Sequence, residues 1–213
     1  MKRFMIILAI SLCILIPSAI TISAGTPKVL LILPKLLNPE NLDTVIHKEV
    51  NVMKGMLEKA NFKVVAATID GLPIKDSKIT FTPDLELSKV KVDDYVGVII
   101  ACMGSGERTP VFPEAVSIVK EAITQRKPVA ASHSSVSALA EAEVLAGKRY
   151  GFRIDGQFRN PKFTGAIYSG MGVVQDGNII TCGICPVVSE SEGFPDCNIE
   201  LIQAFIDALN RQK

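Results

Sequence analysis

The sequence has no excess of charge of either sign. Its 213 residues include 23 lysines and arginines against 22 aspartates and glutamates, which gives a formal net charge of +1 at pH 7. A protein that binds nucleic acid or an anionic membrane needs a concentrated basic surface. The balance of charge therefore argues against both as the main partner of this protein.

The sequence also lacks internal repeats and low-complexity tracts, and it has no hydrophobic segment of membrane-spanning length after its first residues. The 189 residues from 25 to 213 suit one domain with a hydrophobic core of its own. We therefore expect a single domain over residues 25–213.

The first 24 residues have the pattern of a secretory signal peptide. Lys2 and Arg3 precede the apolar stretch FMIILAISLCILI, and a small residue, Ala24, stands where cleavage is expected. This pattern predicts an exported protein, periplasmic or extracellular, with no membrane attachment after cleavage. An uncleaved membrane anchor is the alternative, because residues 4–22 approach the length needed to span a bilayer. Cleavage would leave 21 basic and 22 acidic residues.

Four cysteines follow the signal segment: Cys102, Cys182, Cys185 and Cys197. Disulfides persist in exported proteins, so an even number of cysteines favours pairing. The spacing CGIC at 182–185 fits a redox pair, a vicinal-loop disulfide or half of a metal site. A redox motif of the thioredoxin type opens a helix after a strand, whereas we expect a polar loop after Pro186. We therefore favour a structural bridge within residues 182–197.

Apolar runs of strand length alternate with helical patterns along the chain. We expect strands at 28–33, 62–68, 95–101 and 128–132. We expect helices at 38–60, 113–127, 135–145 and 198–210, with Gly147 as the stop of the third. Nearly continuous apolar strands in such an alternation predict a mostly parallel sheet covered by helices on both faces.

Two hairpins complete the expected fold. Residues 69–93 have a mixed pattern that predicts a hairpin and a helical turn, and Asp176-Gly177 marks the turn of a later hairpin. Ligands of such sheets bind beyond the carboxyl ends of the strands. That rule predicts that residues 34–38, 102–107 and 132–135 are neighbours.

The segment PVAASHSSVSALAEAEVLAGKR, residues 128–149, forms the turn from strand to helix where an α/β enzyme commonly places its nucleophile. The turn offers Ser132, His133, Ser134 and Ser135, and no cysteine. A serine nucleophile of the GxSxG type needs flanking glycines, which are absent. Serines at the start of a helix are more often N-caps, and we interpret them so.

Three phrases, DDYVGVIIACMGSG, KPVAASHSSVSALAEAEVLAGKR and GVVQDGNIIT, resemble the PfpI/ThiJ family of the class I glutamine amidotransferase-like group. The resemblance covers nearly all of residues 27–211. It implies a flavodoxin-like three-layer sandwich, frequent homodimers, and a cysteine on the elbow between strand and helix. A helix glutamate stands beside that cysteine, and backbone amides of a glycine pair lie opposite. Family activities include peptidase, glyoxalase or deglycase-like, and chaperone-like roles.

Only some of the family's site residues are matched by the same residue type in this sequence. The position of the family's cysteine falls on His133, and the histidine that follows it falls on Ser134. The glycine pair falls near Cys102 and Met103, with Gly104 and Gly106 just beyond. The helix glutamate falls on Glu49, with Asp43 and Glu40 as alternatives. His47 is expected on the surface of that helix and is assigned no role.

Three functional hypotheses follow. The first is a family member with little or none of the usual activity that binds a small molecule around Glu49, Cys102 and His133. The residues expected to line that ligand are Met103, Gly104, Ser132 and Ser134. The second is a hydrolase or a glyoxalase/deglycase-like enzyme, in which His133 is the acid/base and Cys102 the nucleophile.

The third hypothesis is a metal-binding module in which His133, Cys102 and one of Cys182 or Cys185 are the ligands. The ligand types are suitable, but no tight spacing supports such a site. The sequence therefore predicts no metal and no cofactor. The expected partners are a small-molecule ligand or substrate and a second copy of the chain.

Overall fold

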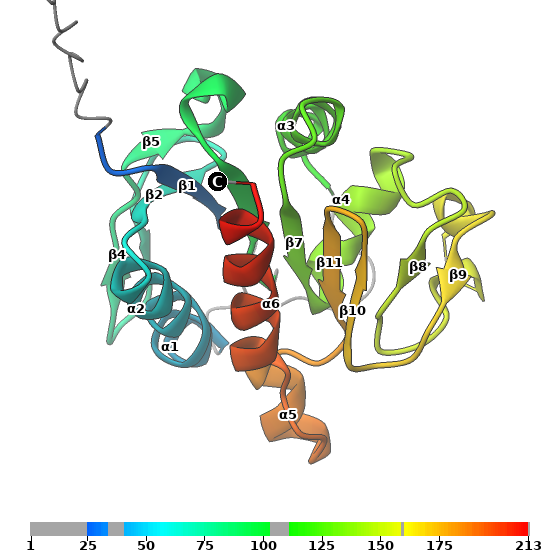
Figure 1. Cartoon of the computed structure of the whole chain (residues 1–213). Coiled ribbons are helices and arrows are strands. Elements are labelled where there is room, and N and C mark those ends of the chain that lie inside the picture. The colour runs from blue at the N-terminus through cyan, green and yellow to red at the C-terminus, as the bar shows by residue number, and fades with distance from the viewer. Residues whose placement is uncertain (1–24, 34–40, 103–110, 159, 213) are drawn as a thin grey trace, which may run out of the picture.

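The computed structural model describes residues 25–33, 41–102, 111–158 and 160–212. The signal segment over 1–24 lies outside these residues, so export stays a prediction. Within the described residues, a central sheet of seven strands lies between two layers of helices (Figure 1). This architecture is the expected flavodoxin-like sandwich.

The order of strands in the sheet is β10-β11-β7-β6-β1-β2-β5. Their bounds are β1 Lys28–Ile32, β2 Lys63–Thr68, β5 Leu85–Glu86, β6 Gly97–Ile100, β7 Val129–Ser132, β10 Val173–Asp176 and β11 Ile179–Cys182. All neighbouring pairs are parallel except β10 with β11. The four central strands coincide with the apolar runs of the sequence.

The helices divide between the two faces of the sheet. Their bounds are α1 Leu42–Thr44, a π-helical segment Val45–Val50, α2 Asn51–Lys59, α3 Pro113–Thr124, α4 Val136–Glu141, α5 Pro186–Glu192 and α6 Asn198–Asn210. One hydrophobic core joins α1, α2 and α6 to the sheet, and a second joins α3 and α4 to its other face. Strand β1 serves both, because Val29 and Leu31 point into the first core and Leu30 and Ile32 into the second.

Short elements fill the connections. Two small sheets pair β3 Ile74–Lys75 with β4 Thr80–Phe81 and β8 Arg149–Tyr150 with β9 Ile167–Tyr168. Single 3-10 turns occupy Leu87–Lys89, Val92–Asp94, His133–Ser135, Gly156–Phe158 and Pro161–Phe163. Both predicted hairpins are present, and the second turns at Gly177, whose φ is 63°.

Three local predictions differ from the structure. Helix α4 ends at Glu141, before the predicted Leu145, because Glu143 adopts a left-handed φ of 59° and Val144 N–H donates to the carbonyl of Leu139. That pattern is a Schellman stop, so Gly147 lies in a later turn. The expected polar loop after Pro186 is helix α5, which begins with that proline and ends at Gly193 in a left-handed conformation.

The third difference is the π-helical segment Val45–Val50 inside the helix expected over 38–60. Such segments are rare and often occur at functional sites. Residues 38–40 of that prediction lie outside the described part of the chain.

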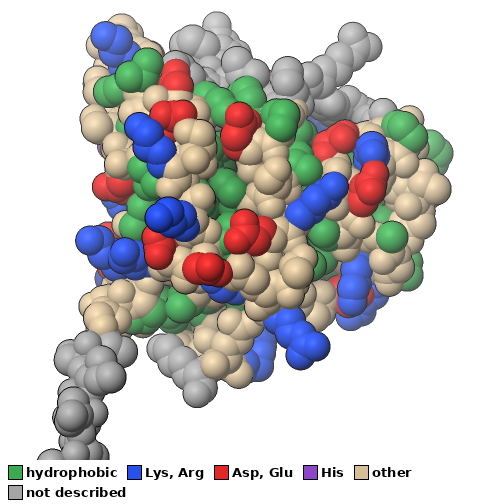
Figure 2. Space-filling model, turned by 90° about the horizontal axis from the view of Figure 1, so that it is seen from above, with side chains coloured by type: hydrophobic (Ala, Val, Ile, Leu, Met, Phe, Trp, Pro, Cys, Tyr) green, Lys and Arg blue, Asp and Glu red, His purple; other side chains and the backbone are tan. Residues whose placement is uncertain are grey.

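Lysine and arginine side chains are interspersed with aspartates and glutamates on the face shown in Figure 2, so the balanced charge of the sequence is visible there. Among the described residues, none of the helices combines the length and the apolar character that crossing a membrane requires.

Candidate active site

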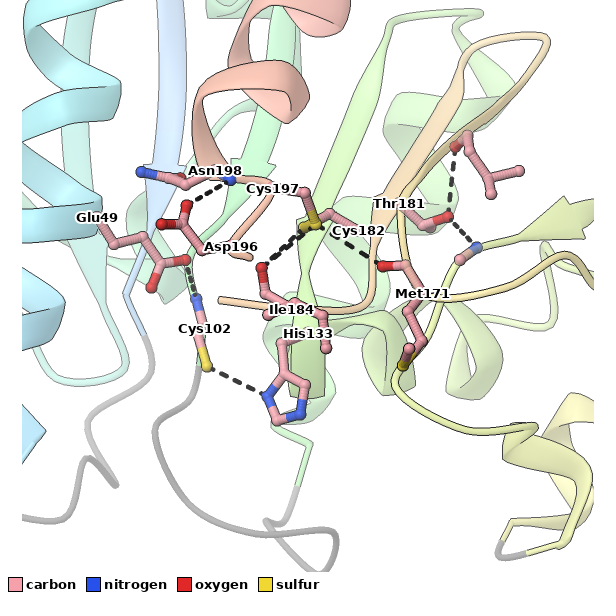
Figure 3. The surroundings of a disulfide bond; sticks show 12 residues. Glu49, Cys102, His133, Met171, Thr181, Cys182, Ile184, Asp196, Cys197 and Asn198 are labelled. Atoms are coloured by element: carbon pink, nitrogen blue, oxygen red, sulfur yellow. Dashed lines mark hydrogen bonds between the residues drawn. A yellow bond between two sulfur atoms is a disulfide. The ribbon is translucent and has the colours of Figure 1, made fainter. Parts of the chain in front are cut away.

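The candidate site lies where β6 and β7 end. These strands are parallel neighbours, with Ile100 opposite Ala131. Cys102 follows the end of β6 by two residues, and His133 follows β7 directly. The register of the sheet therefore brings a thiol and an imidazole side by side, as the carboxyl ends of parallel strands predict (Figure 3).

Cys102 and His133 form a thiol–imidazole pair. The Sγ atom of Cys102 lies 3.5 Å from Nδ1 of His133 and 3.7 Å from Oγ of Ser134. Cys102 is 1% exposed, whereas His133 is only partly buried. The imidazole ring stacks on Phe152, with 6.1 Å between the ring centroids. The sequence did not point to Phe152. The pair has the contact that proton transfer from sulfur to nitrogen needs.

His133 stands at a sharp turn of the backbone. Its φ of 45° is left-handed, a conformation that is uncommon for residues other than glycine. Such strain often occurs at functional sites, where the surrounding structure enforces it. The geometry is that of an elbow between strand and helix.

The serines around His133 do not act as the predicted N-caps. Neither Ser132 nor Ser135 makes a side-chain cap to the following turn. Ser135 Oγ instead donates to the carbonyl of Ala101, which ties the elbow to the end of β6. Ser132 is buried in β7, and its hydroxyl makes no hydrogen bond of good geometry within the described residues. The cap prediction is therefore wrong for Ser132 and Ser135, and the hydroxyl of Ser135 is oriented by its bond to Ala101.

Glu49 reaches the site from the π-helical segment. Its Oε1 accepts a hydrogen bond of 2.8 Å from the backbone N–H of Cys102, and its Oε2 makes no full hydrogen bond within the described residues. Burial, followed by the neighbouring charge of Cys102, raises the pKa of Glu49 from 4.5 to about 8. The Ser132 side chain acts in the opposite direction and lowers this pKa, so it faces the carboxyl group without a well-aligned bond. At neutral pH the carboxyl group is mostly protonated.

The other two candidate acids do not compete with Glu49 in the described structure. Asp43 is exposed and lies 3.6 Å from the exposed His47, which confirms that this histidine is on the helix surface. Glu40 lies outside the described residues. Among the described candidates, Glu49 is the acid that contacts Cys102.

Of the two alternative cysteine ligands in the predicted metal-binding module, Cys185 is the one that lies beside Cys102 and His133. It is buried at the N-cap position of α5, and its sulfur lies within 4.8 Å of the donor atoms of Cys102 and His133. A hydrogen bond with Cys102, followed by burial, raises the pKa of the Cys185 thiol above its ordinary range. The available signal was the position of Cys185 just after β11, which is the parallel neighbour of β7.

The remaining two cysteines form a disulfide. Cys182 at the end of β11 is bonded to Cys197 at the start of α6, which confirms a bridge within residues 182–197. The CGIC segment does follow a strand and open a helix, so the argument we used against a redox motif was wrong. The bridge to Cys197 nevertheless separates Cys182 from Cys185.

Two predicted ligand-binding residues, Met103 and Gly104, lie outside the described residues, as does Gly106. Of the two residues on which the family's glycine pair falls, Cys102 and Met103, the structure therefore describes only Cys102. Of the other predicted ligand-binding residues, Ser134 contacts the Cys102 sulfur and Ser132 faces Glu49. Their roles stay predictions.

The protein is thus a flavodoxin-like α/β sandwich with the thiol of Cys102 at the carboxyl edge of its sheet. The model of the DJ-1/PfpI family matches residues 41–185. The chain belongs to the DJ-1/PfpI family.

Solved structures are similar to this fold. A ThiJ/PfpI domain protein from Brachyspira murdochii has a TM-score of 0.69 at 19% identity, over 88% of this chain and 99% of that one. DJ-1 from Schizosaccharomyces pombe has a TM-score of 0.61 at 17% identity, over 87% of this chain and 97% of that one. At these identities the likeness concerns the fold alone.

Curated relatives match over a shorter span. An uncharacterised protein of Archaeoglobus fulgidus is 39% identical over 103 residues, which are 46% of this chain and 58% of the relative. One from Methanocaldococcus jannaschii is 36% identical over 102 residues, 47% of this chain and 50% of the relative. The match therefore spans about half the length of these relatives.

Proposed function

We propose that this protein is a thiol-dependent enzyme that acts on small carbonyl compounds, with Cys102 as nucleophile and His133 as acid/base. The observation that carries the proposal is the distance of 3.5 Å between Cys102 Sγ and His133 Nδ1. A thiolate is a far better nucleophile than a thiol, and a neighbouring imidazole can generate it. The pair supplies both parts of that chemistry.

The first chemical step follows from these two groups. Neutral His133 accepts the thiol proton at Nδ1, and the sulfur of Cys102 then forms a bond to the carbonyl carbon of the substrate. The π electrons of the carbonyl group move to its oxygen, which takes the proton back from the imidazolium. The product is a hemithioacetal on Cys102, and no other reactant is consumed.

Glu49 positions the nucleophile in this proposal. Its carboxyl group holds the backbone of Cys102 through the 2.8 Å hydrogen bond. A protonated carboxyl adds no negative charge beside a forming thiolate, whereas an ionised one would oppose it. Glu49 thus supports the thiolate by its position and by its neutrality.

The burial of the site favours small substrates. Cys102 is 1% exposed, and its partner His133 is partly buried. A short aldehyde or 2-oxoaldehyde fits such a site better than an extended peptide. Among the activities that the family resemblance implies, the glyoxalase or deglycase-like type is therefore the one we propose.

A second candidate is a binding protein without turnover. It is supported by His133, which occupies the strained elbow where the resemblance places the family's cysteine. In that case a small ligand binds at the same site, around Glu49, Cys102 and His133, without being converted. Export through residues 1–24 and a homodimer remain further proposals that rest on the sequence and on the family.

Methylglyoxal consumption by the purified full-length protein tests the reaction. Cys102→Ser is expected to lower kcat/KM at least about a thousandfold. His133→Asn is expected to lower it by about 100- to 10,000-fold, the usual contribution of a general base. His47→Asn removes the other histidine of the chain and is expected to leave the rate unchanged. Wild-type protein that binds methylglyoxal but does not consume it would favour the second candidate.

A further inference from the structure

Three soft donor atoms converge at the site, from three separate segments. Cys102 follows β6, His133 follows β7, and Cys185 lies between β11 and α5. Their ligand atoms all lie within 4.8 Å of one another. The proposed carbonyl chemistry uses Cys102 and His133 and gives Cys185 no task.

The spacing of these atoms fits a tetrahedral metal centre. A zinc ion with Zn–S bonds of about 2.3 Å and Zn–N bonds of about 2.0–2.1 Å holds sulfur and nitrogen about 3.5–3.6 Å apart, and two sulfurs about 3.8 Å apart. The observed distance from Cys102 Sγ to His133 Nδ1 is 3.5 Å. One edge of the tetrahedron therefore already has its expected length.

The chemistry of the donors selects the class of metal. Thiolate and imidazole ligands suit zinc, whereas magnesium and calcium prefer carboxylate and carbonyl oxygens. The remaining cysteines among the described residues, Cys182 and Cys197, are joined in a disulfide and offer no thiolate. The carboxylate of Glu49 is not among the clustered donor atoms, so the ligands that the described residues offer are two sulfurs and one nitrogen.

We propose that Cys102, His133 and Cys185 bind one zinc ion, with the fourth coordination position left open. Binding displaces the two thiol protons, so two thiolates and one Zn²⁺ form a centre with no net charge. Such a centre suits this location, because both sulfurs are buried. His133 is partly buried, so the open position is expected on its side.

Zinc at this site excludes the proposed carbonyl reaction by the thiol. The metal occupies the single lone pair of His133 Nδ1, so this nitrogen can no longer accept the thiol proton, and it binds the sulfur of Cys102 as a thiolate. The metal-free and zinc-bound forms are therefore two chemically different states of one site. The zinc proposal does not depend on the carbonyl activity, since binding is measured directly.

The test is titration of the full-length protein, stripped with a chelator, with Zn²⁺ by calorimetry and with Co²⁺ by absorption spectroscopy. We expect one equivalent of Zn²⁺, and thiolate-to-cobalt charge-transfer bands with the strong visible absorption of a tetrahedral centre. Loss of outer-shell partners typically weakens metal binding 10- to 100-fold. Removal of a direct ligand, in Cys185→Ser or His133→Asn, is therefore expected to weaken it by at least about 100-fold. His47→Asn is the matched control and should bind as the wild type does.

Absence of zinc binding by folded wild-type protein would overturn the proposal. Equal affinity of the wild type, Cys185→Ser and His133→Asn would overturn it too, since the metal would then lie elsewhere. Circular dichroism checks that each variant folds, and Cys185→Ala replaces Cys185→Ser if the serine variant does not. The two proposals can fail separately. Stripped protein that binds zinc but does not consume methylglyoxal would overturn only the proposed reaction. Stripped protein that consumes methylglyoxal but does not bind zinc would overturn only the metal site.

Discussion

Cys182 and Cys185 are separated by only two residues in the chain but belong to two different regions of the molecule. Cys182 ends strand β11 and is bonded to Cys197 at the start of α6. Cys185 lies at the start of α5, beside Cys102 and His133. One cysteine thus joins two elements of the fold, and the other contributes a thiol to the candidate site.

The difference shows how one short segment can serve both structure and chemistry. The bridge fixes the end of β11 against α6, and the chain between Cys182 and Cys185 is then too short to move far. The disulfide therefore holds the backbone that presents Cys185 to Cys102. Substitutions in the disulfide and substitutions in the candidate site should therefore have different effects.

Loss of the bridge should have the largest effect on stability. A disulfide across a sequence separation of 15 residues contributes about 3 kcal/mol to the free energy of unfolding. We expect Cys182→Ala/Cys197→Ala to lower the unfolding free energy by about that amount, as measured by urea denaturation. Reduction of the wild type should cause the same loss, whereas reductant should not change the double variant. A double variant as stable as the wild type would show that the bridge does not stabilise the fold.

The candidate site should make the stability of the protein depend on pH, through Glu49. The pKa of Glu49 is 4.5 ordinarily and about 8 in the folded metal-free protein. Between these values the folded state holds one proton more than the unfolded state, so stability falls as pH rises, by up to about 1.4 kcal/mol per pH unit.

Glu49→Gln should remove this contribution, because glutamine stays neutral. Urea denaturation at pH 6 and pH 7 compares the two slopes, and Asp43→Asn is the control at an exposed carboxyl group. Wild-type and Glu49→Gln proteins with the same slope would show that Glu49 is ionised in the folded state.

A smaller effect is expected from the strained elbow. His133 has a φ of 45°, which costs a residue with a side chain about 1 kcal/mol relative to glycine. His133→Gly and His133→Ala both lose the stacking on Phe152, but only alanine keeps the strain. The glycine variant should therefore be more stable than the alanine variant by about 1 kcal/mol in thermal denaturation. An alanine variant of equal or greater stability would show that the elbow relaxes.

Much of the fold could be predicted from the sequence, because buried parallel strands are nearly continuous apolar runs. The same reasoning predicted that Cys102 and the elbow are neighbours, since both follow the carboxyl ends of adjacent strands. The π-helical segment that carries Glu49 could not be predicted, because the spacing of apolar residues indicates a helix but not its hydrogen-bond pattern. The serine caps failed because a capping hydroxyl also bonds to tertiary partners, here the carbonyl of Ala101.

The sequence left Cys185 and Cys182 as alternatives for a different reason. The pattern after Pro186 predicts a polar loop, although proline is favoured at the first position of a helix. A helix start at this point, directly after a strand next to β7, places Cys185 at the same edge of the sheet as His133. Recognising Pro186 as the start of a helix would therefore have predicted that Cys185 lies near Cys102 and His133.

Whether Cys102 and His133 form a reactive pair can be measured as the rate of thiol alkylation at Cys102 and at Cys185. Metal-free full-length protein is treated with iodoacetamide at neutral pH, and modification of Cys102 and Cys185 is followed by peptide mass spectrometry. We predict that Cys102 reacts first and that His133→Asn slows it by about 100-fold, the lower range of general-base effects, whereas His47→Asn does not. An unreactive Cys102, or a rate that does not change in His133→Asn, would contradict the account.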